Sequence, residues 1–251
     1  MPIYNINSGP RGFLQADSAA IISPPPQEIL ARSINSANPL TTGLELAVYG
    51  GDLRNYAKSQ FCNNPSPAYI SKSIEKGGNS WYDNGTVASA RFNLPANSLF
   101  RSSSSLITWV ISFLVLDNST IYSLVEGSFN NFGSVGLRLN TSGKIQGWNS
   151  AQGTIFTSNS SVSIKSIATI AVAVNPVGGT YRLAINGTFD SSGTFTGYTP
   201  TTSGPVLFTD YGMLFPFKGH LFGFWSWPNR YLSDPELIEV SCNPQQLFQS
   251  P

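Results

Sequence analysis

The chain has 251 residues, with 14 lysines and arginines against 13 aspartates and glutamates, and only 11% of its residues are charged. This length suits one large all-β domain with an appendage, or two small domains, and it allows a sizeable core. A net charge of +1 provides no basic field for phosphates, so we expect no nucleic-acid partner. A surface of Ser, Thr, Asn and Gly packs against neighbours without burying charges, which favours an assembly subunit over a free cytosolic enzyme.

The first segment, residues 1 to 38, differs in composition from the rest of the chain. It has no basic start followed by an apolar run, so we expect no signal peptide, no membrane-spanning segment and synthesis in a cytoplasm. Its "SPPPQE" is typical of an extended polyproline-type spacer. We interpret residues 1 to 38 as an arm that docks on its own domain or on a neighbouring subunit, and residues 39 to 251 as the folded domain. The arm's candidate docking residues have no steady period: Ile3, Tyr4, Ile6, Phe13, Leu14, Ile21 and Ile22.

From Leu40 onward, short β-rich runs alternate with turn sequences. Runs such as "LELAVYG", "IYSLVEG" and "HLFGFWSW" are separated by Gly, Asn and Pro clusters such as "NPVGG". Many short strands with frequent turns predict a β-sandwich. "TWVISFLVL" and "ATIAVAV" are almost continuously apolar, which predicts central strands covered on both faces. "VGLRLN" and "TYRLAING" alternate, as half-exposed strands do.

One helix is predicted near the C-terminus, in "LSDPELIEVSCNP". Ser233 is the predicted N-cap, Pro235 lies in the first turn, and Glu236 has the spacing of a capping box. The helix should end before Pro244. Four apolar side chains are expected to close one edge of the sandwich: Leu237, Val240, Leu247 and Phe248.

Residues 217 to 248, "FKGHLFGFWSWPNRYLSDPELIEVSCNPQQLF", carry three successive motifs: an F-x-G-x-L-x-G strand, an R-x-L-S-D-x-E turn into a helix, and a terminal N-P-x-Q-L-F. This stretch resembles the end of laminin G-like, concanavalin A-like lectin domains in bacterial and tailed-phage proteins. "NPLTTGLELAVYGGDLRN" resembles the opening of the phage-type domains, and "IAVAVNPVGGTYRLAING" resembles their paired strands with an NG turn. The residues that match the closing motifs are Phe217, Gly219, Leu221, Gly223, Arg230, Leu232, Ser233, Asp234, Glu236, Asn243, Pro244, Gln246, Leu247 and Phe248.

The resemblance spans residues 38 to 248 and implies a jelly-roll sandwich of two antiparallel sheets. In this family the fold serves glycan binding, protein adhesion and structural roles on virions, so it implies no single activity. Our first hypothesis is a non-enzymatic structural protein of a tailed-phage virion, which decorates or cements the capsid while its arm docks on neighbouring subunits. The alternative is a tail-fibre or spike module that binds host glycan. A third hypothesis, an extracellular adhesion domain, is weakened by the missing signal sequence.

Both phage hypotheses predict a protein located on the virion. Its partners would be other virion proteins, either the major capsid protein or tail proteins. By analogy with decoration proteins and fibres that meet symmetry axes, we expect a homo-oligomer, for which a trimer is the common arrangement.

Metal and cofactor chemistry finds little support in the sequence. Calcium sites cluster carboxylates in short loops, whereas the acids here are scattered, as Asp117, Glu126, Asp190 and Asp210 illustrate. The two cysteines are far apart and there is a single histidine, which argues against a structural zinc site. We therefore expect no metal and no cofactor. Cys62 and Cys242 form either a disulfide or two buried free thiols, and we favour the thiols.

The titratable residues also predict no enzyme. A glycosidase needs two carboxylates that face the same bond. The nearest pairs, Glu236 with Glu239 and Glu45 with Asp52, lack the close spacing of the acidic cluster in sandwich-fold glucanases. His220 lies in a strand expected to close the core, with no nucleophile motif beside it, so we interpret it as structural.

Glycan binding would require an exposed aromatic ring flanked by hydrogen-bonding groups, because a sugar ring has an apolar face and a rim of hydroxyls. The candidates are Trp81, Tyr82, Trp148 and Tyr211, each of which could instead pack in the core or in a subunit interface. Three tryptophans within apolar strands are predicted to be core residues: Trp109, Trp225 and Trp227. Five N-x-S/T sequons are interpreted as chance products of composition, or as glycan sites if the protein is secreted: Asn84, Asn118, Asn140, Asn159 and Asn186.

Overall fold

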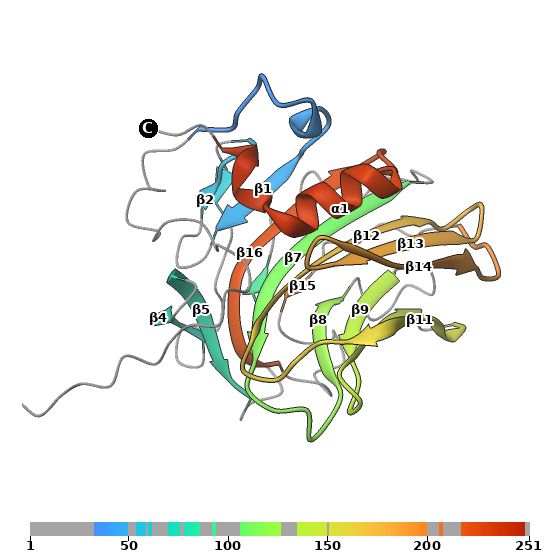
Figure 1. The fold of residues 1–251 in the computed structure, drawn as a ribbon, viewed down its shortest axis with the longest axis horizontal. Coiled ribbons are helices and arrows are strands. Elements are labelled where there is room, and N and C mark those ends of the chain that lie inside the picture. The colour runs from blue at the N-terminus through green and yellow to red at the C-terminus, as the bar shows by residue number, and fades with distance from the viewer. Residues whose placement is uncertain are drawn as a thin grey trace, which may run out of the picture.

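Two antiparallel β-sheets pack face to face, with one short helix near the C-terminus, in the computed structural model (Figure 1). This arrangement confirms the predicted sandwich fold. The structure describes residues 33–49, 54–58, 60–61, 70–75, 78–85, 92–93, 106–126, 135–149, 151–199, 206–207 and 217–248. Several residues named above lie outside this set, namely the seven candidate docking residues of the arm together with Asp52, Cys62, Asp210 and Tyr211.

The larger sheet has ten strands among the described residues. Its main path runs through β14 (Thr188–Thr194), β13 (Thr180–Ile185), β12 (Ile167–Asn175), β7 (Ile107–Val115), β16 (Lys218–Pro228), β1 (Leu46–Tyr49), β2 (Arg54–Asn55) and β3 (Gln60–Phe61). The long strand β16 pairs with β7 along one side. On its other side its first half pairs with β5 (Gly78–Asn84), which also pairs with β4 (Ile70–Glu75), and its second half pairs with β1.

The smaller sheet has six described strands. Their order is β11 (Gly153–Ser161), β10 (Lys144–Asn149), β9 (Val135–Leu139), β8 (Tyr122–Glu126), β15 (Val206–Leu207) and β6 (Phe92–Asn93). The two sheets meet where β11 contacts β14. There the Asp190 carboxylate accepts hydrogen bonds from the backbone N–H groups of Asn159 and Ser160, both at 2.8 Å, and so ties the two edge strands together.

Strand β12 shows why the central strands are apolar on both faces. Ile170, Val172 and Val174 point into the core between the sheets, whereas Ala171 and Ala173 point to the outer face. Both sets are buried. Side chains alternate along a strand, so large residues fill the space between the sheets and small ones lie under whatever covers the outer face. The predicted double coverage of this strand and of β7 is confirmed, since every residue of β7 is buried.

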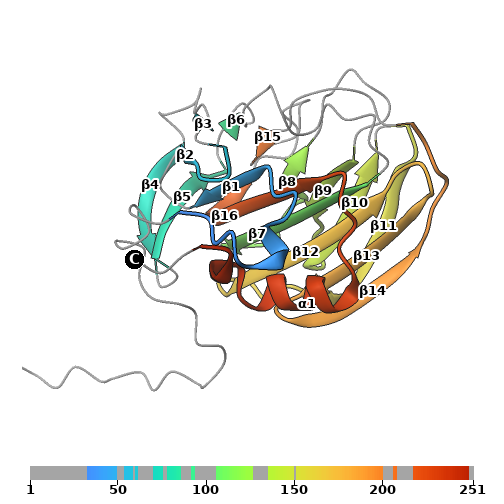
Figure 2. The ribbon, with the colours of Figure 1, turned by 90° about the horizontal axis from the view of Figure 1, so that it is seen from above.

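Helix α1 (Asp234–Cys242) covers the outer face of the larger sheet, where it packs against β12, β13 and β14 (Figure 2). The alanines of β12 leave room for this close approach. The predicted N-cap is confirmed: the Glu236 carboxylate accepts hydrogen bonds from the backbone N–H and the hydroxyl of Ser233, both at 2.8 Å. Leu237 and Val240 are fully buried, as are Leu247 and Phe248 in the segment that follows.

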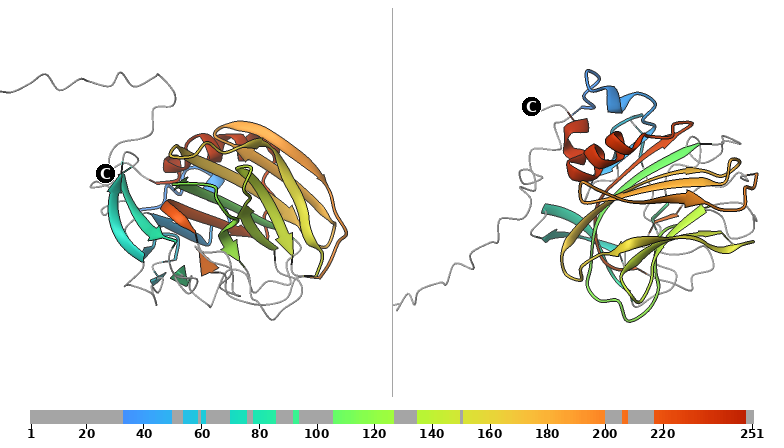
Figure 3. Two further views of the ribbon diagram at one scale, coloured as in Figure 1. Left: turned by 90° about the horizontal axis from the view of Figure 1, so that it is seen from below. Right: turned by 45° about the vertical axis from the view of Figure 1, so that its right-hand side comes forward.

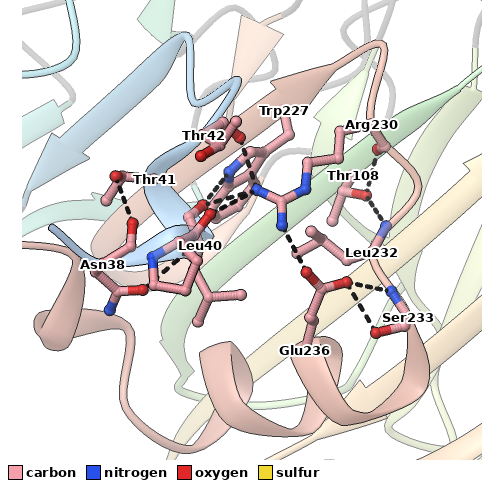
Figure 4. Close-up of polar contacts among 11 residues, drawn as sticks. Asn38, Leu40, Thr41, Thr42, Thr108, Trp227, Arg230, Leu232, Ser233 and Glu236 are labelled. Atoms are coloured by element: carbon pink, nitrogen blue, oxygen red, sulfur yellow. Dashed lines mark hydrogen bonds and ion pairs between the residues drawn. The ribbon is translucent and has the colours of Figure 1, made fainter. Parts of the chain in front are cut away.

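Arg230 joins the helix to the start of the domain (Figure 4). Its guanidinium donates to the carbonyls of Pro39 at 3.1 Å and Thr42 at 2.7 Å, next to the short helix η2 (Pro39–Thr41), and it pairs with Glu236 at 2.5 Å. The indole N–H of Trp227 donates to the carbonyl of Leu40 at 2.7 Å. These contacts hold the first described segment against the last strand.

The join between the two ends of the domain begins at Ile34, inside the segment predicted as arm. Ile34 forms a β-bridge with Phe248, and the Asn35 N–H donates to the carbonyl of Leu247 at 2.8 Å beside the short helix η3 (Pro244–Leu247). The chain is therefore part of the sandwich from this point.

Two smaller predictions are wrong. All five residues of β9 are buried, although "VGLRLN" was expected to be half-exposed, because Arg138 lies beneath an aromatic ring and not in water. The Cys242 side chain was expected to be buried, but it is a free, exposed thiol in the last turn of α1. The side chain lies beside Gly187, in the turn between β13 and β14 at the end of the larger sheet.

Candidate functional site

Two of the predicted aromatic platforms are neighbours on β5 and point to opposite faces. Trp81 faces the core between the sheets and is only 3% exposed, so of its two alternatives it takes core packing and does not present a platform for glycan. The alternation of side chains along the strand places Tyr82 on the outer face instead. There its ring packs at 4.9 Å from the His220 ring and is half-buried.

His220 is a buried residue with a hydrogen-bonding partner, in agreement with the structural role predicted for it. Its Nδ1 lies 3.0 Å from the hydroxyl of Ser80. Ser80 is fully buried, which keeps its hydroxyl away from any substrate in solution. The pair therefore holds β5 against β16 and does not resemble an accessible nucleophile with its base.

Trp148 lies on the outer face of the smaller sheet and is half-buried. The guanidinium carbon of Arg138, on the neighbouring strand β9, lies 3.7 Å from the centroid of its ring. Arg138 is only 6% exposed. Because the arginine is buried and the tryptophan is not, the guanidinium lies on the inner side of the indole. The exposed part of the ring is turned away from Arg138.

The register of the sheet surrounds this ring with polar groups. Gln146 stands opposite Arg138 on one side and Thr157 on the other, with its amide 3.5 Å from the threonine hydroxyl. Lys144 lies on the same face of β10, since it is two residues before Gln146. We call this set the Trp148 face: Arg138, Lys144, Gln146, Trp148 and Thr157.

The Trp148 face and Tyr82 cannot form one site. Tyr82 belongs to the larger sheet and Trp148 to the smaller one, and each points outward from its own sheet. Seen from below, the strands of the smaller sheet lie in front and α1 lies behind the larger sheet (Figure 3, left). Among the described residues, α1 packs only on the larger sheet, and the Trp148 face is on the opposite side of the sandwich.

The sequence indicated Trp148 but not its surroundings. The alternation in "KIQGW" places Lys144, Gln146 and Trp148 on one face, and could have been used to find the first two. Arg138 and Thr157 could not be found in this way, because their place beside Trp148 depends on how β9 and β11 pair with β10.

Several acids that were considered for catalysis or for calcium binding have structural partners, whereas Glu239 is exposed on α1 and has no side-chain partner among the described residues. Glu236 caps α1, and Glu45 pairs with Lys58 at 3.0 Å. Asp117 pairs with Lys218 at 2.7 Å and also accepts a hydrogen bond from the Tyr122 hydroxyl. The Lys218 ammonium, followed by the Tyr122 hydroxyl, lowers the pKa of Asp117. In the described part of the chain, no three histidine, cysteine, aspartate or glutamate side chains form a group that could hold a metal ion.

Asp83 is the one described acid whose environment raises its pKa. It follows Trp81 on the core face of β5 and is fully buried. One carboxylate oxygen accepts a hydrogen bond from the Gly85 N–H at 2.9 Å, and the other has no hydrogen-bond partner among the described residues. Burial raises its pKa to about 7, against the smaller opposing effect of the Gly85 hydrogen bond. It is a buried carboxyl group, with no access for a substrate.

Four of the sequon asparagines use their side chains to hold loops. The Asn118 amide donates to the Thr141 carbonyl at 2.8 Å, and the Asn159 amide donates to the Asp190 carbonyl at 2.9 Å. Asn140 and Asn186 accept hydrogen bonds from backbone N–H groups. Such contacts give asparagine a structural reason at these positions.

Comparison with known proteins gives a fold but no family. No protein-family model matches the chain, and no curated protein matches it. A structural neighbour is domain 4 of AbnA, an extracellular arabinanase from Geobacillus stearothermophilus, in complex with arabinotriose. Its TM-score is 0.61 at 16% identity, over 79% of this chain and 98% of that domain.

A second neighbour is a Trypanosoma rangeli sialidase in complex with difluorosialic acid. It has a TM-score of 0.62 at 13% identity, over 82% of this chain and 34% of the sialidase, so this chain spans about a third of that protein. At such identities both likenesses show the β-sandwich fold alone. In the described residues, no helix is long and apolar enough to cross a membrane.

Proposed function

We propose that this protein is a non-enzymatic carbohydrate-binding module that holds a glycan on the Trp148 face, and that it serves as a receptor-binding protein of a tailed-phage particle. The observation that carries the proposal is the half-exposed Trp148 ring, which lies on the buried Arg138 guanidinium among hydrogen-bonding side chains. The structural likeness to an arabinanase domain in complex with arabinotriose supports the same class of function.

The chemistry of the face suits a sugar ring. The apolar side of a pyranose or furanose ring packs on an indole, and the contact excludes water from both. Gln146 and Thr157 provide an amide and a hydroxyl that can donate to or accept from sugar hydroxyls. Arg138 holds the indole from below by a cation–π contact, so little side-chain entropy is lost when a ligand packs on it.

A glycan array with purified protein tests the proposal. We expect the wild type to bind a defined set of glycans and Trp148→Ala to lose that binding by about tenfold or more, because the stacking surface is gone. Tyr82→Ala, which removes a half-buried aromatic ring from the other sheet, is the matched control and should bind as the wild type does. Binding that survives Trp148→Ala and fails in Tyr82→Ala would contradict the proposal.

The place on a phage particle rests on the resemblance of residues 217 to 248 to tailed-phage laminin G-like domains. A second candidate, capsid decoration, is favoured by a charged fraction of only 11%, which suits a surface buried in an assembly. Deletion of residues 2 to 32 separates the two, since it leaves the contacts of Ile34 and Asn35 in place. If the protein decorates capsids through its arm, the deletion should abolish its incorporation into particles. If it is a receptor-binding module, glycan binding should survive.

A further inference from the structure

We infer that the Trp148 face is selective for acidic glycans, with the Lys144 ammonium as the contact for a ligand carboxylate. This inference rests on the proposed function, because it names the substrate class of the same site. It is carried by three features of the face: the free charge of Lys144, the absence of acids on the three strands, and the distance between Lys144 and Trp148.

Lys144 differs from most cationic side chains of the described structure. Lys58, Arg182, Lys218 and Arg230 each pair with a carboxylate, at 3.0, 3.4, 2.7 and 2.5 Å respectively. Lys144 has no ion pair and no side-chain hydrogen bond with any described residue, although it is half-buried on a strand. Its charge is therefore available to a ligand.

The strands of the smaller sheet next to Lys144 carry no acidic residue of their own. The Asp190 carboxylate of β14 meets the end of β11 at the N–H groups of Asn159 and Ser160 and forms no ion pair with Lys144. The sequences of β9, β10 and β11 are VGLRL, KIQGWN and GTIFTSNSS, which contain Arg138 and Lys144 but no aspartate or glutamate. In a chain with a net charge of only +1, the Lys144 ammonium is the charge that this face offers to an anion.

The geometry sets the size of the ligand. Lys144 and Trp148 lie on one face of β10 and are four residues apart, which corresponds to about 13 Å along a strand. Gln146 lies between them on the same face. A single sugar ring spans only part of this backbone distance, so the ligand should be an oligosaccharide that runs along β10. One ring would stack on Trp148 while the carboxylate of another ring meets Lys144.

Isothermal titration calorimetry with matched ligands tests this inference. The probes are tetragalacturonate and 3′-sialyllactose, each beside its carboxyl-reduced form, which has the same rings without the charge. We expect the wild type to bind at least one acidic probe about three- to tenfold more tightly than its reduced form at low salt. The difference should shrink as the salt concentration rises, because a surface charge pair is screened.

Two variants test whether Lys144 causes the preference for the acidic form of the ligand. Lys144→Gln should bind the acidic and reduced forms equally. Lys58→Gln removes a lysine beside the larger sheet, where it pairs with Glu45 at 3.0 Å, and should keep the wild-type preference.

The outcomes separate the inference from the proposed function. Equal binding of acidic and reduced forms by the wild type would overturn the inference and leave the proposed function standing. A preference that persists in Lys144→Gln would overturn the role of Lys144. If no probe binds and the glycan array is also empty, the inference and the proposed function fail together.

Discussion

The two outer faces of this sandwich are built in opposite ways. On the larger sheet, small residues such as Ala171 and Ala173 lie beneath α1, and the indoles of Trp225 and Trp227 are fully buried in the same cluster. On the smaller sheet, the outward side chains of β10 are Lys144, Gln146 and Trp148, all of them half-buried. One face is sealed by the chain itself, and the other presents polar groups and an aromatic ring.

This difference separates stability from binding. Residues on the sealed face should change the free energy of unfolding and leave ligand affinity alone. Residues of the Trp148 face should change ligand affinity and leave the free energy of unfolding nearly unchanged, because shortening a half-exposed side chain removes little buried contact area. Substitutions on the two faces test that separation, and they are ordered here by decreasing change in stability.

Leu237→Ala should have the largest effect on stability. Leu237 is fully buried between α1 and the larger sheet, so its truncation leaves a cavity and should cost about 2–5 kcal/mol of unfolding free energy. Urea unfolding followed by circular dichroism measures the change. Val177→Ala, at a side chain that is 54% exposed, is the control and should change little. A loss below about 1 kcal/mol for Leu237→Ala would show that α1 is not a sealed part of the fold.

Asp83→Asn should alter the pH dependence of stability without affecting either outer face. The folded protein keeps the Asp83 proton up to a pKa of about 7, whereas the unfolded chain releases it near 3.8. Stability should therefore fall as the pH rises from about 4 to about 7 and then level off, by a few kcal/mol at most, given about 1.4 kcal/mol per unit of pKa difference.

Asp83→Asn should remove the fall in stability between pH 4 and pH 7, and at pH 8 it should be more stable than the wild type. Unfolding curves between pH 4 and pH 8 check this expectation. Asp234→Asn, at a half-exposed aspartate on α1, is the control and should keep the decline. If Asp83→Asn shows the same pH dependence of stability as the wild type, the raised pKa of Asp83 is wrong.

Arg230→Lys should cost about 1–3 kcal/mol, since a lysine cannot donate at once to the carbonyls of Pro39 and Thr42 and to Glu236. Burial acts to raise the pKa of Glu236, but the Ser233 N–H and hydroxyl and the Arg230 guanidinium outweigh it, so the pKa is lowered. This contribution to stability is present at neutral pH and is lost as the pH falls into the range where the carboxylate protonates.

The loss in Arg230→Lys should thus be larger at pH 7 than at pH 3, by denaturant unfolding at both values. An equal loss of unfolding free energy at pH 7 and pH 3 would show that the ion pair between Arg230 and Glu236 does not contribute to stability. Glycan affinity should be unchanged in this variant, because Arg230 lies on the sealed side of the molecule.

Gln146→Ala should have the smallest effect on stability, within about 0.5 kcal/mol. Its effect on ligand affinity should be about two- to tenfold, the value of one hydrogen bond. Calorimetric titration with the glycan that binds most tightly on the array measures it. Thr188→Ala, at an exposed threonine on β14 of the larger sheet, is the control and should bind as the wild type does. An unfolding change above 1 kcal/mol in Gln146→Ala would place this residue among the structural ones.

Much of the fold could be predicted from the sequence, because its signals are local. The capping residues Ser233 and Glu236 and the apolar runs of β7 and β12 indicate their structures without knowledge of the partners. The site could be predicted only in part. Trp81 and Trp148 both lie in short polar surroundings in the sequence, and only the pairing of strands shows that one faces the core and the other the surface. Arg138 was missed because its contact with Trp148 joins two paired strands, β9 and β10, and the sequence does not show how they pair.

The most direct test of the account is a titration that follows the indole N–H signals of the five tryptophans by NMR. Four of them are buried, namely Trp81, Trp109, Trp225 and Trp227, and should not respond to ligand. When the glycan that binds most tightly on the array is added, only the Trp148 signal should move, and it should do so in proportion to the bound fraction. Binding that leaves the Trp148 signal in place, or that moves the signals of the buried tryptophans instead, would contradict the assignment of the site.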